Sequence, residues 1–216
     1  MVQTPTQLEI EYPLPDGSPM AESDSAREYL IYSVKSLQIH FQQQDDVYVS
    51  GNLEIFYKQG VPSAKIAPDV FVVFGIRDYP RTSYKLWEEG GKVPNFVLEV
   101  TSKSTQENDE EDKPQKYARL GVQEYFQFDP TGDYLNPPLK GRQLINGIYQ
   151  PIKSTQLADG ILSIHSKVLG LDLRLLNGQL RFFNPQTGQR LLSHEEAEAE
   201  IARLKFLLKQ QGIDLD

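Results

Sequence analysis

The 216-residue chain contains no cysteine. This absence excludes disulfide bonds, thiolate nucleophiles, and zinc or iron–sulfur sites held by cysteine. Histidine is also scarce, since His40, His165 and His194 are the only three and lie far apart in the sequence. A histidine-rich zinc site is therefore disfavoured, and any metal site has to draw on carboxylates.

Long hydrophobic runs are missing as well. No apolar run approaches the roughly 18 residues of a membrane-spanning helix, and the N-terminus lacks the basic-then-apolar pattern of a signal peptide. Hydrophobic residues make up 39% of the chain and charged residues 24%, which is typical of a globular protein. We therefore expect a cytoplasmic protein that does not associate with membranes.

An overall excess of positive charge is lacking too. The formal net charge of −8 counts against a general affinity for nucleic acid. Residues 131–192, however, hold seven lysines and arginines against three acids. These bases fit two interpretations, contact with phosphate groups and protection of a solvated sheet edge. They are Lys140, Arg142, Lys153, Lys167, Arg174, Arg181 and Arg190.

The length of the chain fits one domain with a substantial core and short terminal additions. Residues 1–22 are rich in Pro, Thr, Glu and Asp and show no periodicity, which predicts an extended N-terminal arm. Residues 23–192 are predicted to form the domain. In residues 193–216, Ser193 and Glu196 form a capping-box pattern that begins an amphipathic helix. That helix either pairs with its copy in a homodimer or docks on its own domain. Its apolar stripe consists of Ala197, Ile201, Leu204 and Leu208.

Hydrophobic periodicity predicts an α/β fold, with a mixed sheet flanked by helices and extended by further β-strands. The expected order is a helix over 25–44, strands over 47–57, 66–74 and 94–101, a helix from about 112 to 120, a strand over 122–128, and short strands over 142–152, 161–164, 171–175 and 180–183. The first two strands should be antiparallel. The helix between residues 101 and 122 predicts a parallel pair on either side of it. Residues 75–93 are either a flap over a site or a packed loop.

Two of these strands each carry one carboxylate, Asp69 and Glu99, without a basic neighbour in the run. Burying a lone charge costs several kcal/mol unless a partner or a metal offsets it. Strand alternation places Glu99 on the same face as Val97 and Thr101. The pair is consistent with a site for magnesium or manganese, and equally with two separate ion pairs to lysines of the next helix.

Four sequence blocks in this order resemble a known family. They are Pro68-Asp69-Val70-Phe71-Val72-Val73, Glu99-Val100-Thr101-Ser102, Lys113 with Tyr117-Ala118-Arg119-Leu120-Gly121-Val122, and Glu124-Tyr125-Phe126 with Asp129-Pro130. The first two look like a PD-(D/E)xK motif, and the set resembles the Uma-two family of predicted restriction endonucleases over roughly residues 25–130. This resemblance implies a restriction-endonuclease-like domain and an Mg²⁺-dependent endonuclease, with Mn²⁺ as an alternative ion, that hydrolyses DNA phosphodiester bonds.

The resemblance also implies roles for single residues. Asp69 and Glu99 match the metal ligands, whereas Thr101 stands where the superfamily has its catalytic lysine. Lys113, at the start of the following helix, is implied to replace that lysine, and its i+4 spacing from Asp109 allows an ion pair. The other candidate lysines are Lys103 and Lys116. An acid on the first helix often completes such sites, and the candidates are Glu28 and, on the first strand, Glu54.

Two other functions are consistent with the same residues. The displaced lysine and the acidic net charge favour a non-catalytic module that binds nucleic acid or protein and retains the nuclease fold. Hydrolysis of a phosphate ester other than nucleic acid is the other alternative, because the sequence contains no base-reading element. The retained pair of acids favours the nuclease, with DNA as the expected partner and a homodimer as the expected assembly.

Overall fold

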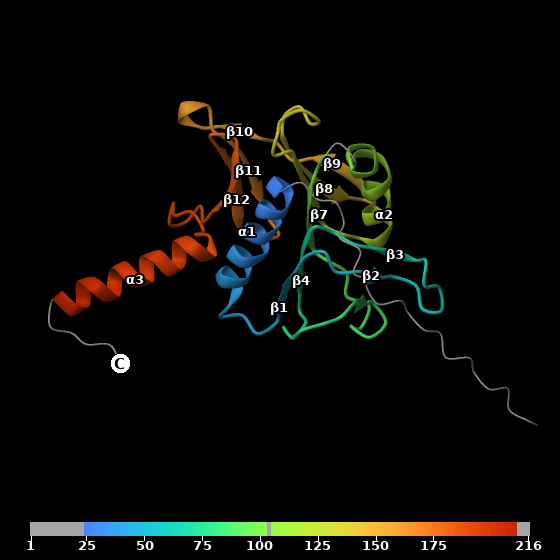
Figure 1. Cartoon of the computed structure of the whole chain (residues 1–216). Helices are drawn as coiled ribbons and strands as arrows, with labels where there is room; N and C mark the ends of the chain where they lie inside the picture. Colours follow the sequence, from blue (N-terminus) through green and yellow to red (C-terminus); the bar gives the residue numbers. More distant parts are fainter. Residues whose placement is uncertain (1–23, 103–104, 211–216) are drawn as a thin grey trace, which may run out of the picture.

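The computed structural model describes residues 24–102 and 105–210, and the predicted arm over residues 1–22 lies outside this part. Figure 1 shows the arrangement of the elements. In chain order they are α1 (Asp24–Phe41), β1 (Val47–Ser50), β2 (Ile55–Phe56), β3 (Lys65–Ile66), β4 (Val70–Phe74), β5 (Tyr84–Lys85), β6 (Phe96–Val100), the π-helix η1 (Asn108–Asp112), α2 (Lys113–Leu120), β7 (Glu124–Phe128), β8 (Leu139–Ile145), β9 (Ile148–Pro151), β10 (Thr155–Gln156), the 3₁₀-helix η2 (Ala158–Gly160), β11 (Leu162–Ser166), β12 (Leu171–Leu176), β13 (Gln179–Phe183) and α3 (His194–Gln210).

A six-stranded sheet with the order β1-β4-β6-β7-β8-β9 forms the centre of the fold. β1 and β4 are antiparallel, and β6 and β7 are parallel, with Glu99 opposite Gln127. The helical segment η1–α2 connects the two parallel strands. Both pairings agree with the sequence prediction, and the α/β class with a mixed sheet flanked by helices is confirmed.

Both faces of this sheet are covered, which explains the continuous apolar runs in its central strands. On one face, Val72 and Leu98 belong to a core that includes Leu37 of α1 and the sheet of order β10-β11-β12-β13. On the other face, Val97 packs in a core with Tyr117 of α2 and the small sheet of order β3-β2-β5. Glu99 points to this second face by strand alternation, toward α2.

Three predicted elements differ from those observed. The strand expected over 47–57 is divided into β1 and β2, which lie in different sheets, and Asn52 between them has a left-handed φ of 49°. The strand expected over 142–152 is the hairpin β8–β9, which turns at Asn146-Gly147 with positive φ at both residues, the signature of a tight hairpin turn. The strand expected over 66–74 begins only at Val70 as β4, whereas Ile66 belongs to β3 in the small sheet. The second helix, α2, begins at Lys113 with Pro114 in its first turn, as expected, and the π-helix η1 precedes it.

The segment over residues 75–93 is a packed loop rather than a flap. The Arg81 side chain is only 3% exposed, and its guanidinium carbon lies 4.1 Å from the Tyr48 ring centroid and 3.7 Å from that of Tyr79. Glu89 accepts two hydrogen bonds from it, at 2.6 and 3.0 Å. Tyr84, in the same loop, is fully buried.

α3 extends away from the rest of the molecule, as Figure 1 shows at the red end of the chain. Its predicted capping box is present: Ser193 Oγ accepts the Glu196 N–H at 3.1 Å, and Glu196 Oε2 accepts the Ser193 N–H at 3.0 Å. Ile201 and Leu204 of the apolar stripe are 53% and 46% exposed, so the chain's own domain does not cover them. The domain boundary at residues 192–193 stays a prediction. No helix in the described ranges is both long and apolar enough to span a bilayer.

Asp129 ends β7 and organises the turn that follows, as its position before Pro130 predicts. Its Oδ2 accepts the N–H groups of Tyr134 at 2.6 Å and Leu135 at 3.0 Å, and Oδ1 accepts two hydrogen bonds from Thr131. Burial acts to raise the pKa of this carboxyl, but the hydrogen bonds outweigh burial and hold the pKa below its ordinary value.

We predict that Asp129→Asn lowers the free energy of unfolding by about 1–2 kcal/mol at pH 7. Because the folded pKa is the lower one, the ionised carboxylate stabilises the fold above its unfolded pKa of about 3.9, and this contribution disappears as the pH falls through the folded value. Urea unfolding at neutral and acidic pH measures both effects. The exposed Asp133→Asn is the control. Equal stability of Asp129→Asn and wild type at pH 7 would contradict the prediction.

Candidate functional site

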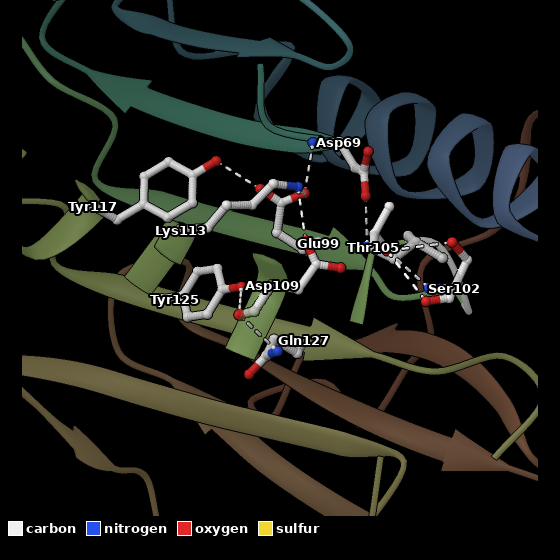
Figure 2. Close-up of polar contacts among 10 residues, drawn as sticks. Asp69, Glu99, Ser102, Thr105, Asp109, Lys113, Tyr117, Tyr125 and Gln127 are labelled. Carbon is white, nitrogen blue, oxygen red and sulfur yellow. Dashed lines mark hydrogen bonds and ion pairs between the residues drawn. The ribbon is translucent and has the colours of Figure 1, made fainter. Parts of the chain in front are cut away.

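Glu99 of β6 is fully buried, and its carboxylate accepts hydrogen bonds from three donors (Figure 2). Its Oε1 accepts the Tyr117 hydroxyl at 2.6 Å, and its Oε2 accepts the Lys113 ammonium at 2.9 Å and the Asp69 N–H at 3.3 Å. Tyr117 and Lys113 are one helical turn apart on α2, which covers this face of the sheet. The local geometry of α2 therefore places both donors on the same carboxylate.

Asp69 precedes β4, and its position is linked to that of Glu99. Asp69 Oδ2 accepts the N–H of Val100 at 2.7 Å, while the backbone N–H of Asp69 reaches Glu99. The antiparallel register of β4 and β6, with Val70 opposite Leu98, brings the two acids to the same end of the strand pair. The close approach of two carboxylates that the sequence predicts is therefore present.

Lys113 is the first residue of α2, and its side chain is 13% exposed. Its ammonium lies 2.9 Å from Glu99 Oε2 and 2.8 Å from Asp109 Oδ1, so the i+4 ion pair expected from the spacing forms. Glu99 thus has a lysine partner from the next helix, which was one of the two interpretations of the lone carboxylates. That partner is the same lysine that the family resemblance implies.

Asp109 is the residue of this cluster that the sequence did not single out as a site residue. Its side chain is 1% exposed, and its backbone carbonyl accepts the Tyr125 hydroxyl at 2.7 Å and Gln127 Nε2 at 3.0 Å. Within the described residues, neither carboxylate oxygen of Asp109 accepts a hydrogen bond of good geometry, so its contact with Lys113 is an ion pair. The spacing to Lys113 was the signal available in the sequence.

The charges of the cluster shift its pKa values in defined directions. Burial raises the pKa of the Asp69 carboxyl well above its ordinary value, and the charge of Glu99 adds to this, while Lys113 opposes it. Burial also raises the pKa of Glu99, against the effect of Lys113. For Lys113, burial acts to lower the pKa, but Glu99 and Asp109 outweigh burial and raise it, so the ammonium stays charged. Two buried carboxylates thus contact the ammonium, and the charge of Asp69 also acts on it.

The remaining predicted site residues lie elsewhere or have other surroundings. Lys116 is exposed on α2, Glu28 is exposed on α1, and Glu54 forms an ion pair with Lys65 of β3. Thr101 is buried beyond the end of β6, and its Oγ1 lacks a hydrogen-bond partner among the described residues. Lys103 falls in the short stretch that the structure leaves undescribed. The structure thus brings together Asp69, Glu99 and Lys113 from the predicted set.

The predicted basic segment is partly neutralised by ion pairs. Lys140 pairs with Glu110 at 2.9 Å, Arg174 with Asp172 at 2.7 Å, and Arg190 with Glu196 at 2.8 Å. These pairs reduce the positive charge that this segment offers to phosphate groups.

The chemistry of the donor set fits a hard divalent cation, because both candidate ligands are carboxylates. Over residues 24–102 and 105–210, no group of three or more His, Asp and Glu side chains has the arrangement of a metal site. Mg²⁺ is commonly held by only one or two protein carboxylates and keeps several waters. The two carboxylates of Asp69 and Glu99 have the donor chemistry that this type of binding uses.

A family model named Uma2 and described as "Putative restriction endonuclease" matches residues 9–175. The chain belongs to the Uma2 family. The matched span includes Asp69, Glu99 and Lys113 and reaches into β12, so Uma2 covers more of the chain than the blocks over residues 25–130. Membership confirms the predicted resemblance and supports nuclease activity as the general function.

Comparison with curated proteins gives no match. Among solved structures, the chain is similar to a protein from Anabaena variabilis ATCC 29413 that is described as a putative nuclease. The two share 11% sequence identity with a TM-score of 0.45, and the similarity covers 68% of this Uma2 chain and 74% of the other.

We predict that Asp69→Asn stabilises the protein at pH 7 in buffer containing a metal chelator. The substitution removes a buried charge next to Glu99, while the Asn carbonyl can still accept the Val100 N–H. The expected gain is about 1 kcal/mol, or a rise in Tm of about 2–4 °C, measured by calorimetry. Asp129→Asn makes the same chemical change at a carboxylate that accepts several hydrogen bonds, and it should lower Tm. A lower Tm for Asp69→Asn would contradict the account of the charges.

Proposed function

We propose that this Uma2 protein is an Mg²⁺-dependent endonuclease that hydrolyses phosphodiester bonds in DNA. In this proposal Asp69 and Glu99 hold the divalent ion, and Lys113 acts beside it. The observation that supports the proposal most directly is the position of these three residues at one end of the β4–β6 pair. There the Asp69 N–H and the Lys113 ammonium both reach Glu99 Oε2, and Asp69 Oδ2 accepts the N–H of Val100. Membership of Uma2 supplies the reaction class.

The residues of the chain have separate tasks in this proposal. The Lys113 ammonium stabilises negative charge that develops on the phosphate, because a fixed cation in a largely buried site acts strongly on such charge. The Tyr117 hydroxyl fixes the orientation of Glu99 through Oε1, which leaves Oε2 for other partners. The chemistry that Mg²⁺ or Mn²⁺ supplies when bound is Lewis-acid polarisation of a phosphoryl oxygen.

The position of Lys113 supports the proposal although a threonine, Thr101, stands at the expected lysine position. The ammonium lies 2.9 Å from Glu99 although it comes from α2 and not from β6. A non-catalytic module that binds nucleic acid or protein is the alternative. It is favoured by the fact that the same ion pair also neutralises Glu99 without any metal.

We predict that the purified protein nicks or linearises plasmid DNA with Mg²⁺ or Mn²⁺, and that a chelator abolishes the reaction. Asp69→Asn and Glu99→Gln should remove the activity, and Lys113→Met should reduce kcat about 100-fold or more, as expected for the loss of an electrostatic group. Lys116→Met, which changes an exposed lysine on the same helix, is the matched control and should cleave like wild type.

Three outcomes would contradict the DNA nuclease. Cleavage that survives Asp69→Asn would come from a contaminant. Absence of cleavage of double-stranded and single-stranded DNA with any divalent ion, while the protein still binds DNA in a mobility-shift assay, would favour the binding module. Hydrolysis of a chromogenic phosphodiester without cleavage of DNA would indicate a phosphate ester of another class.

We also propose that α3 pairs with its copy in a homodimer, which would bring two sites to two DNA strands. The stripe of Ala197, Ile201, Leu204 and Leu208 has the 4-3-4 spacing of a coiled-coil seam. Glu200 and Lys205 flank it, so two parallel copies would place opposite charges across the seam. α3 has 17 residues, and most of its apolar stripe lacks cover from the described part of the domain. A helix of this length is marginally stable in water by itself, which favours a partner.

We predict a solution mass of twice the 24.6 kDa chain by light scattering coupled to gel filtration. Ile201→Glu places a charge in the seam and should give a monomer, whereas Ala202→Glu adds the same charge beside the seam and should remain dimeric. A monomeric wild type, or a dimer that tolerates Ile201→Glu, would refute pairing through α3.

A further inference from the structure

One ammonium, that of Lys113, is shared between two buried carboxylates. It lies 2.9 Å from Glu99 Oε2 and 2.8 Å from Asp109 Oδ1 (Figure 2). The proposed function assigns Glu99 to the divalent ion. A lysine that loses its only anionic partner to a metal would be repelled by that metal, so a second anion is needed to keep it in place.

The backbone of Asp109 is held by contacts that do not involve Lys113. Its backbone carbonyl accepts the Tyr125 hydroxyl at 2.7 Å and Gln127 Nε2 at 3.0 Å, and both donors belong to β7. Its N–H donates to the Thr105 carbonyl at 2.8 Å. The π-helix η1 ends at the residue before Lys113, so Asp109 stays one turn before Lys113 on the same side of the segment. Contacts with β7 therefore hold the Asp109 backbone at the site, and its carboxylate contacts Lys113 there.

The two carboxylates differ in what they gain from Lys113. Glu99 also accepts the Tyr117 hydroxyl and the Asp69 N–H, so it keeps two donors when the ammonium moves away. The oxygens of Asp109 accept no hydrogen bond within the described residues, and its side chain is 1% exposed. Burying such a carboxylate costs several kcal/mol, which the ion pair with Lys113 offsets. The asymmetry favours Asp109 as the lasting partner of the ammonium.

We infer that Asp109 is a positioning residue that holds the Lys113 ammonium at the site while a divalent ion occupies Asp69 and Glu99. The inference rests on the proposed function, because it assigns Glu99 to the metal. Movement of the ammonium toward Asp109 frees Glu99 Oε2 and keeps the positive charge beside the reacting phosphate. Asp109 itself contacts neither the ion nor the substrate.

The test is a double-mutant cycle on Mn²⁺ affinity, measured by calorimetry and by electron paramagnetic resonance with the full-length chain. Asp109→Asn should weaken Mn²⁺ binding about tenfold, because the ammonium then stays on Glu99 and competes with the ion. In a Lys113→Met background the same substitution should weaken binding by about threefold or less, since no ammonium remains to be held.

Two further variants separate positioning from a loss of structure. Glu110→Gln changes the next residue of η1, which pairs with Lys140, and should leave Mn²⁺ affinity unchanged. Asp109→Glu keeps the charge and should restore part of the affinity. At saturating Mg²⁺, Asp109→Asn should lower kcat for DNA cleavage and change KM for DNA by less than about twofold, because Asp109 acts through Lys113.

The outcomes distinguish this inference from the proposed function. A wild type that binds no Mn²⁺, or that binds it equally well after Asp69→Asn, overturns both. The positioning role alone is overturned by the following pair of results. The wild type binds Mn²⁺ through Asp69, and Asp109→Asn weakens that binding by the same factor whether residue 113 is Lys or Met. The positioning role is also overturned if a folded Asp109→Glu variant regains no Mn²⁺ affinity. The same holds if Asp109→Asn changes only KM for DNA and leaves kcat unchanged.

Discussion

The organisation of this site depends on one charge interaction, the contact of a single ammonium with buried carboxylates. Lys113 lies between Glu99 and Asp109, and Asp69 adds a third carboxyl group whose pKa is raised by burial and by Glu99. The fold therefore places more negative than positive charge in a largely buried position. Such an arrangement is costly for stability alone, and it is the arrangement expected if the site holds a divalent cation, as proposed above.

The central sheet makes this arrangement available because helices and smaller sheets cover both of its faces. Close pairing of β4 and β6 brings Asp69 and Glu99 together, and the connection from β6 to β7 carries η1 and α2 across the same face. Tyr117 then fixes Glu99, while Tyr125 and Gln127 of β7 fix the backbone of Asp109. Membership of Uma2, described as "Putative restriction endonuclease", connects this geometry with the proposed nuclease activity.

The sequence was sufficient to predict the parts of this picture that follow from periodicity and spacing. Strand alternation placed Glu99 on the same face as Val97 and Thr101, which the structure shows to be the face covered by α2. The i+4 spacing paired Asp109 with Lys113. The division of residues 47–57 into two strands coincides with a left-handed backbone conformation at Asn52. Asn adopts this conformation only occasionally, so the sequence did not indicate the break. The Asn146-Gly147 pair, by contrast, is a recognised hairpin signal. The sequence alone could therefore have predicted this turn, although a single strand was expected here.

The importance of Asp109 was beyond sequence reasoning because it depends on tertiary contacts. The π-helix η1 has no simple sequence signature, and the bonds from Tyr125 and Gln127 reach the Asp109 carbonyl from another strand. Whether a carboxylate in an acidic run such as residues 107–112 is exposed or buried follows from those contacts and not from the run itself. Glu111 and Asp112 of the same run are exposed.

The most direct test of the account is the location of a bound ion in crystals soaked with Mn²⁺, using its anomalous scattering. The account predicts one ion in contact with the carboxylates of both Asp69 and Glu99, with the Lys113 ammonium still beside Asp109. An ion bound elsewhere, or a site that stays empty with Lys113 seated on Glu99 at saturating Mn²⁺, would contradict it.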